Sequence, residues 1–203
     1  SEIKQGTFKN CIFTKISLPQ SCTEIGEEAF KNCKRLIRIK ISTNTEDIYP
    51  EAFSDCTKLR IVENLEKCKI LKLQNKLFYN CSSLKYVEYP STVAKIESLC
   101  FGNCTSLETI EISENVNEVS NDFIDGCSNL ITFACLSKKL YKGDFIYSLK
   151  INNLEITEYP KNFKFKEIDG KIYINLTNRC TNDCIFCLRK CNGKYFSCYI
   201  GKC

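Results

Sequence analysis

Three cysteines near the end of the chain, Cys180, Cys184 and Cys187, stand close enough in sequence to share one chemical role. Three thiolates at this spacing, on a loop that follows a predicted strand, can converge on one metal centre. Two other interpretations stay open: the six cysteines of this segment can pair as three disulfides, or Cys184 and Cys187 can bind zinc with two further thiolates. The compartment decides between disulfides and metal, and the sequence does not show the compartment.

A short hairpin is predicted immediately before this loop. Alternating residues at 163–166 and 171–176 flank Asp169 and Gly170, a dipeptide typical of tight turns between antiparallel strands. We therefore expect residues 159–203 to form a second unit, a small β-hairpin followed by an irregular, cysteine-rich tail.

The cysteine loop, with the residues from Tyr173 to Arg179 that lead into it, resembles the iron-sulfur loop of the radical S-adenosylmethionine superfamily. The resemblance implies that Cys180, Cys184 and Cys187 would hold a [4Fe-4S] cluster whose open iron binds S-adenosylmethionine. Phe186 would lie beside the adenine. Only 16 residues follow Cys187, whereas the family's partial barrel would need on the order of 150 more. We expect this chain alone to be inactive, either as a fragment of such an enzyme or as a remnant of one.

The composition excludes several classes of active site and of partner. The chain has 203 residues, of which 43% are apolar, 16 are cysteine and none is histidine. Without histidine, Ser-His and Cys-His nucleophile pairs and histidine-containing zinc sites are ruled out. The 29 basic and 24 acidic residues are interleaved, so we expect no nucleic-acid partner. No apolar run approaches the ~20 residues that a membrane-spanning helix requires.

The strongest pattern in the sequence is a repeat of about 23 residues. In most copies a cysteine is preceded, three residues earlier, by an aromatic or aliphatic residue and is followed, three residues later, by leucine. These cysteines are Cys11, Cys33, Cys56, Cys81, Cys104 and Cys127. A seventh copy, with Ser148 at the cysteine position, extends the array to about residue 158.

The repeat contains the Leu-x-x-Leu-x-Leu spacing of leucine-rich repeats, in which a short strand places alternate side chains in a core. One coil cannot bury its own apolar face, so neighbouring coils must stack. We predict a leucine-rich repeat solenoid of about seven repeats, with short parallel strands, over residues 1–158. Because the chain opens inside a repeat, at Ile3, we also expect further repeats before Ser1.

Copies such as the one from Ile25 to Leu36 resemble the BspA-like leucine-rich repeat family. The resemblance implies a non-catalytic binding scaffold, often a microbial cell-surface protein of adhesion or host interaction, with no cofactor for the repeats. A surface or secreted location would accompany disulfides in the tail, and a cytoplasmic location would accompany an iron-sulfur cluster.

The repeat cysteines have two interpretations. In the first, which we favour, each thiol is a buried small group that packs beside the preceding phenylalanine and donates weakly to a backbone carbonyl, forming a ladder. In the second, cysteines of neighbouring repeats are cross-linked, although parallel side-chain directions disfavour that pairing.

The predicted binding surface is the outward side of the repeat strands, where exposed residues alternate with buried ones. Its mixed charge and one aromatic residue suit a protein or glycan ligand. The predicted contact residues are Arg38, Lys40, Arg60, Lys85, Tyr86, Glu88, Glu108 and Glu111.

Overall fold

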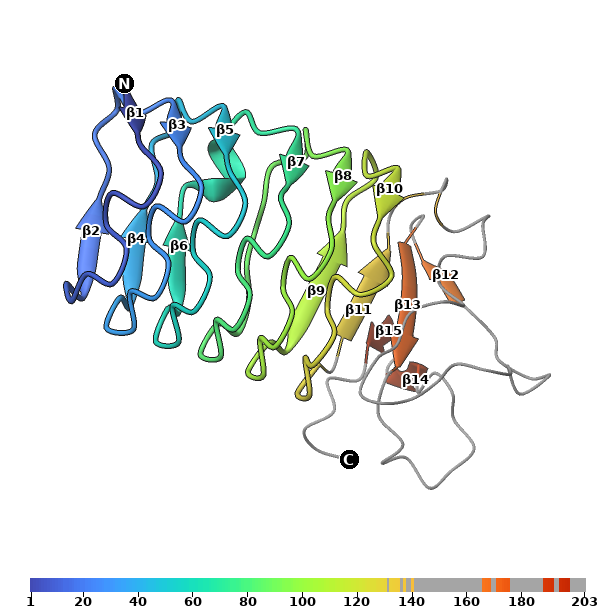
Figure 1. The fold of residues 1–203 in the computed structure, drawn as a ribbon. Coiled ribbons are helices and arrows are strands. Elements are labelled where there is room, and N and C mark those ends of the chain that lie inside the picture. Colours follow the sequence, from blue (N-terminus) through green and yellow to red (C-terminus); the bar gives the residue numbers. More distant parts are fainter. Residues whose placement is uncertain are drawn as a thin grey trace.

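The computed structural model describes residues 1–130, 132–135, 137 and 140, and four later strands at 166–168, 171–175, 188–191 and 194–197. Six coils stack side by side as a parallel β-solenoid (Figure 1). We number them from the amino terminus as coil 1 (1–22), coil 2 (23–45), coil 3 (46–70), coil 4 (71–93), coil 5 (94–116) and coil 6 (117–140). The predicted solenoid of short parallel strands is therefore confirmed, while the rest of the predicted seventh repeat lies outside the described residues.

The first row of strands runs along one edge of the solenoid (Figure 1) and contains a single two-residue strand from each coil. In order these are β1 (Glu2–Ile3), β3 (Glu24–Ile25), β5 (Asp47–Ile48), β7 (Lys72–Leu73), β8 (Lys95–Ile96) and β10 (Glu118–Val119). They form two three-stranded parallel sheets, β1-β3-β5 and β7-β8-β10. In each strand the second residue faces the core and the first faces outward, as the two-residue period of a strand requires.

The second row of strands forms the longer sheets. It contains β2 (Lys15–Ser17), β4 (Arg38–Lys40) and β6 (Ile61–Glu63) in one parallel sheet, and β9 (Thr109–Ile112) and β11 (Thr132–Cys135) in another. The register pairs equivalent repeat positions, such as Ile16 with Ile39 and Ile39 with Val62. We call the outward side of this row, including residues 60–63 and 85–88, the strand face.

A ladder of aromatic rings and thiols fills the third side of each coil. Phe8, Phe30, Phe53, Phe78 and Phe101 stack along the solenoid with centroid separations of 5.1, 5.4, 5.5 and 5.7 Å. From coil 2 onward, each ladder thiol donates to the carbonyl of the phenylalanine in the preceding coil, as from Cys81 Sγ to Phe53 O at 3.2 Å. Four further bonds repeat this geometry at 3.0–3.1 Å, from Cys33, Cys56, Cys104 and Cys127.

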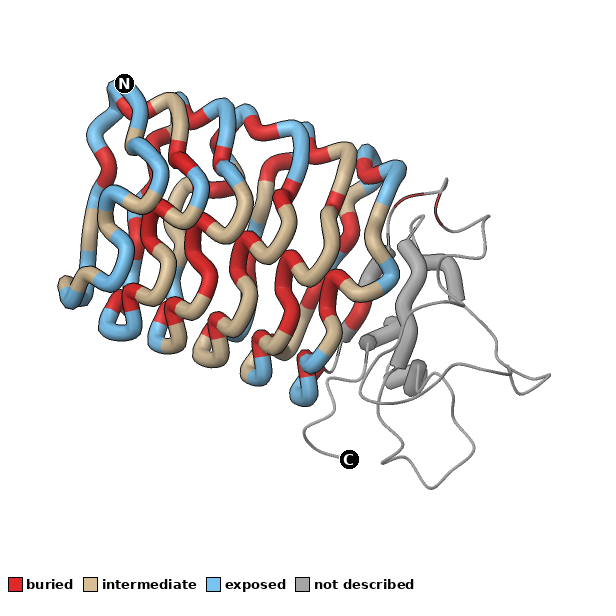
Figure 2. The backbone as a smooth tube through the Cα atoms, viewed as in Figure 1, coloured by how far each residue is buried: buried red, intermediate tan, exposed pale blue. Residues whose placement is uncertain are grey.

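These bonds confirm the first interpretation of the repeat cysteines. The thiols of Cys33, Cys56 and Cys81 are free and completely buried. Figure 2 shows buried inner positions and more exposed turns in the middle coils, whereas coil 1 at the amino-terminal end is mostly exposed or half-buried. The carbonyl acceptor of each bond belongs to the preceding coil, so the thiols join coils together.

The residue before each ladder cysteine has a left-handed backbone. The φ angles are 63° at Asn10, 61° at Asn32 and 78° at Gly126, and Asp55, Asn80 and Asn103 behave alike. Asparagine, aspartate and glycine tolerate this conformation best, because a short polar side chain can hydrogen-bond locally and glycine has no Cβ. The sequence thus selects the sharp corner that follows each phenylalanine.

Replacing Gly126 with alanine should lower the free energy of unfolding by about 2–3 kcal/mol. An added Cβ would lie 2.1 Å from Asn103 Oδ1, whose amide nitrogen donates to the Tyr79 hydroxyl at 2.9 Å. Gly6→Ala is the matched control, since Gly6 also has a positive φ of 62° but no atom lies within 4 Å of its added Cβ. Urea denaturation of both variants separates backbone strain from steric clash, and equal losses would contradict the predicted clash.

Both rows of strands are interrupted between coil 3 and coil 4. Cys56 and Cys81 are 25 residues apart, whereas the other ladder cysteines are 22 or 23 apart. The longer coil contains the 3₁₀ helix η1 (Leu65–Lys67), which follows Asn64 in a left-handed conformation. Residues 85–88, predicted to form a strand, do not, and the row of arrows in Figure 1 has no member between β6 and β9. This is the one departure from the predicted strand pattern in the described coils.

A hairpin continues the last sheet beyond coil 6. Strands β12 (Lys166–Ile168) and β13 (Lys171–Asn175) pair antiparallel as the predicted hairpin, with the first strand at 166–168 instead of the predicted 163–166. Strand β13 also pairs antiparallel with β11, opposite Ala134 at Tyr173, so the sheet order is β12-β13-β11-β9. The prediction of an irregular tail is wrong at residues 188–197. Here β14 (Leu188–Cys191) and β15 (Lys194–Ser197) form a second hairpin.

Candidate binding surface on the strand face

The strand face displays the predicted contact residues in three parallel rows. Strands place side chains alternately inward and outward, so equivalent positions of successive coils line up across the face. Arg38, Lys40, Arg60, Lys85, Tyr86, Glu88 and Glu111 are exposed, and Glu108 is half-buried. The structure therefore brings these eight residues onto one side of coils 2–5. Their role in binding stays a prediction.

Opposite charges on the strand face are partly paired between neighbouring coils. Arg38 contacts Glu63 at 3.1 Å from Nη1 to Oε1, and Lys85 donates to Glu108 at 2.7 Å. Exposed pairs of this kind contribute roughly 0–1 kcal/mol to stability. These ion pairs leave the strand face polar and nearly neutral. Its charged residues are therefore better suited to selecting a binding partner than to stabilising the stack of coils.

Two exposed apolar side chains occupy the middle row of this face. Tyr86 is 50% exposed and Ile61 is 38% exposed, at equivalent positions of coils 4 and 3. Charged or polar residues fill the same position in the other described coils: Lys15, Arg38, Thr109 and Thr132. Sequence analysis identified Tyr86 and missed Ile61, although a comparison of this one position across the repeats would have found it.

The Tyr86 hydroxyl donates to Glu88 Oε1 at 3.0 Å. Burial of the phenol, together with this hydrogen bond to a carboxylate, raises the pKa of Tyr86 to about 12. The side chain is therefore a neutral hydrogen-bond donor at physiological pH, with an apolar ring and a polar tip on the same surface. Such amphipathic rings are common at the centres of macromolecular interfaces.

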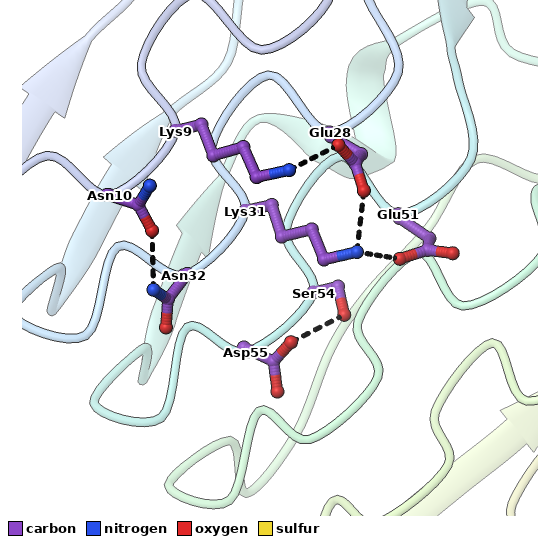
Figure 3. Close-up of polar contacts among 8 residues, drawn as sticks. All are labelled: Lys9, Asn10, Glu28, Lys31, Asn32, Glu51, Ser54 and Asp55. Carbon is purple, nitrogen blue, oxygen red and sulfur yellow. Dashed lines mark hydrogen bonds and ion pairs between the residues drawn. The ribbon is translucent and has the colours of Figure 1, made fainter.

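A separate charged network lies at the corners of coils 1–3 (Figure 3). Glu28 accepts hydrogen bonds from Lys31 and Lys9, each at 2.6 Å, and Lys31 also contacts Glu51. Hydrogen bonds from Lys31 and Lys9 lower the pKa of Glu28, while those to Glu28 and Glu51 raise the pKa of Lys31. Lys9 with Glu28 and Lys31 with Glu51 each pair charges of adjacent coils, so this network joins coils 1–3.

The ladder thiols of coils 2–6 are buried. Burial raises the pKa of Cys104 and of Cys100 well above the ordinary value, which keeps both as neutral thiols. Among the residues that the structure describes, no group of three cysteine or carboxylate side chains could hold a metal ion. The predicted metal ligands Cys180, Cys184 and Cys187, with Phe186, lie outside the described residues.

A solenoid of short parallel strands, with leucines buried at a fixed interval after each corner, is the architecture of leucine-rich repeat proteins. The chain matches the model of the BspA type leucine rich repeat region over residues 1–131 and again over 67–178. It belongs to that family, as the repeat sequence predicts. No curated protein matches the chain. In the part of the chain that the structure describes, no helix is long and apolar enough to span a membrane.

Solved structures give the same fold. The chain is 30% identical to a leucine rich repeat protein of T. pallidum, with a TM-score of 0.60, over 64% of this chain and 60% of that one. It is 27% identical to a leucine rich cell surface protein of Faecalibacterium prausnitzii, with a TM-score of 0.53, over 68% of this chain and 43% of that one. The chain thus spans less than two thirds of the length of either protein. Neither they nor the family match supports the radical S-adenosylmethionine resemblance.

Proposed function

We propose that this chain is a non-catalytic scaffold that binds a protein or glycan partner through its strand face. The observation that carries the proposal is the pair of exposed apolar side chains, Ile61 and Tyr86, at one repeat position of adjacent coils. Polar and charged residues surround the pair, and a central apolar patch with a polar rim is the usual anatomy of a binding surface.

A microbial cell-surface role in adhesion or host interaction is a further part of the proposal. The similar protein of Faecalibacterium prausnitzii is described as a cell surface protein, which supports such a location for this chain. The absence of histidine and the burial of the Cys104 thiol, which raises its pKa and keeps it neutral, support a role that does not include catalysis.

Removing the central side chains should weaken binding without unfolding the solenoid. We expect the double variant Ile61→Ala and Tyr86→Ala to lose roughly 10–100-fold in affinity, because central aromatic residues contribute most of the binding energy of an interface. The probes are a random peptide display library and a glycan array, each screened first with the unchanged chain. Affinities of the selected ligands are then measured by biolayer interferometry.

The matched control carries Tyr49→Ala and Leu71→Ala, which remove side chains that are 40% and 66% exposed and lie outside the strand face. This control should bind the selected ligands as the unchanged chain does. Ligands that tolerate the strand-face variant but not the control would place the binding surface elsewhere and overturn the proposal.

We also propose, on cysteine spacing alone, that Cys180, Cys184 and Cys187 hold a metal centre. Iron, zinc and free-thiol content should be measured on one anaerobically prepared sample. A triple variant with alanine at these three positions is the control. Near four irons per chain, lost in the variant, is the result expected for an iron-sulfur loop. Bound zinc, or the absence of metal with six fewer free thiols, would overturn the cluster in favour of a zinc site or disulfides.

A further inference from the structure

The junction between coil 3 and coil 4 differs from the other junctions between described coils. Strands of coils 1–3 pair with one another in both rows, as do those of coils 4–6 in the first row. Among the described residues, no strand of coil 3 pairs with a strand of coil 4 in either row. The second-row ladder is also absent between coils 4 and 5, but those coils pair in the first row, so the junction between coils 3 and 4 alone lacks strand pairing on both sides among the described coils.

The third side of the junction remains intact. Backbone hydrogen bonds join Glu51 N to Asn75 O at 3.0 Å, Phe53 N to Leu77 O at 3.1 Å and Asp55 N to Tyr79 O at 2.8 Å. The rings of Phe53 and Phe78 stack here at 5.5 Å, within the 5.1–5.7 Å range of the other stacked pairs. Outside this corner, two side-chain hydrogen bonds cross the junction of the described coils, from Ser82 Oγ to Thr57 O at 3.3 Å and from Thr92 Oγ1 to Ile70 O at 2.8 Å.

The backbone of residues 86–88 shows the same interruption. In the described structure, the N–H groups of Tyr86, Val87 and Glu88 donate no hydrogen bond to coil 3 or coil 5. The hydroxyl of Tyr89 bonds backbone groups of coil 5 in place of a paired strand. Tyr89 Oη donates to Glu111 O at 2.7 Å and accepts from Ser113 N. Coil 4 is thus joined to coil 5 through the phenylalanine corner, the first row of strands and side chains, and to coil 3 chiefly through the phenylalanine corner.

The cause is the extra length of coil 3. Its two additional residues are accommodated by η1, in which Lys67 N donates to Asn64 O and Cys68 N donates to Leu65 O. These local bonds turn the chain inward instead of extending it beside coil 4. Parallel strands pair only when the register is kept from coil to coil. The insertion therefore ends strand pairing in both rows at the junction between coils 3 and 4.

We propose that the junction between coils 3 and 4 is a hinge, about which coils 1–3 and coils 4–6 rotate as two rigid bodies. The phenylalanine corner is the axis, because it alone retains backbone bonds and ring stacking, while the two strand rows open and close. Interiors resist bending where ladders are continuous and yield where few backbone bonds cross. Ile61 and Tyr86 stand on opposite sides of the hinge, so its opening changes the distance between them.

Distances between spin labels test the hinge on the folded chain. Labels on non-natural amino acids replace Asp47 and Lys95, which lie in β5 and β8 on either side of the junction. Two control pairs are also two coils apart in the same row: Glu2 with Asp47, and Lys72 with Glu118. The distance distribution across the junction should be about twofold wider than that of either control pair.

A deletion variant provides the second measurement. Removing Glu66 and Lys67 gives coil 3 the 23 residues of its neighbours, and the distribution across the junction should narrow to that of the control pairs. Equal widths for all three pairs in the unchanged chain would overturn the hinge, whether or not the deletion variant folds. Because these distances need no ligand, the hinge can fail or hold independently of the proposed binding function.

Discussion

The Cys81→Lys variant is expected to lose the cooperative unfolding transition of the solenoid. Cys81 is completely buried, its thiol donates to Phe53 O, and burial raises its pKa. A lysine there would bring an unpaired charge into an apolar core, which costs several kcal/mol against a total stability of about 5–15 kcal/mol. Circular dichroism during heating measures the transition.

The control for this variant is Cys81→Ser. Serine keeps a small side chain with a donor for the Phe53 carbonyl, and the predicted seventh copy has Ser148 at this position. We expect a loss of about 1–2 kcal/mol with a transition that remains cooperative. If Cys81→Lys melts like Cys81→Ser, the side chain at this position reaches solvent and the buried ladder is wrong.

Phe78→Ala is the second substitution with a large expected effect, a loss of about 3–5 kcal/mol in the free energy of unfolding. The ring is completely buried and stacks on both neighbours, at 5.5 Å from Phe53 and 5.7 Å from Phe101. Its removal leaves a cavity in the middle of the array and breaks two ring contacts together. Urea denaturation provides the measurement.

Phe8→Ala gives the matched comparison for Phe78→Ala. Phe8 occupies the same repeat position in coil 1, but it is only half-buried, stacks on Phe30 alone at 5.1 Å and contacts Phe13 edge-on at 5.9 Å. Its loss should therefore be clearly smaller than that of Phe78. Comparable losses would show that local propensity, and not stacking between coils, determines the contribution of the phenylalanines.

The core of this fold could be predicted from the sequence because apolar residues recur at the same positions of each repeat. A single Leu36 or Phe30 would be ambiguous, but six copies in phase identify which residues face inward. The thiol ladder followed from the same reasoning, since a small donor beside phenylalanine in every coil needs a nearby acceptor. That the acceptor belongs to the preceding coil depends on stacking geometry, which periodicity does not contain.

Other features were beyond sequence reasoning for physical reasons. The longer interval between Cys56 and Cys81 was visible, yet its effect on strand pairing depends on whether the extra residues extend the strand or turn inward at η1. The pairing of β13 with β11 joins residues about 40 positions apart through backbone bonds, which carry little side-chain signature. Ile61 was missed because an apolar residue in a repeat strand is ordinarily assigned to the core.

The thiol ladder also bears on how quickly the chain reaches its native state. Its bonds join residues one coil apart, such as Cys33 with Phe8 at a separation of 25 and Cys81 with Phe53 at 28. Each added coil therefore closes a loop of similar, modest length, unlike β-proteins whose strands pair across the whole chain. Folding can begin at any neighbouring pair of coils and spread in both directions, so that its rate depends on forming the first pair far more than on the length of the array.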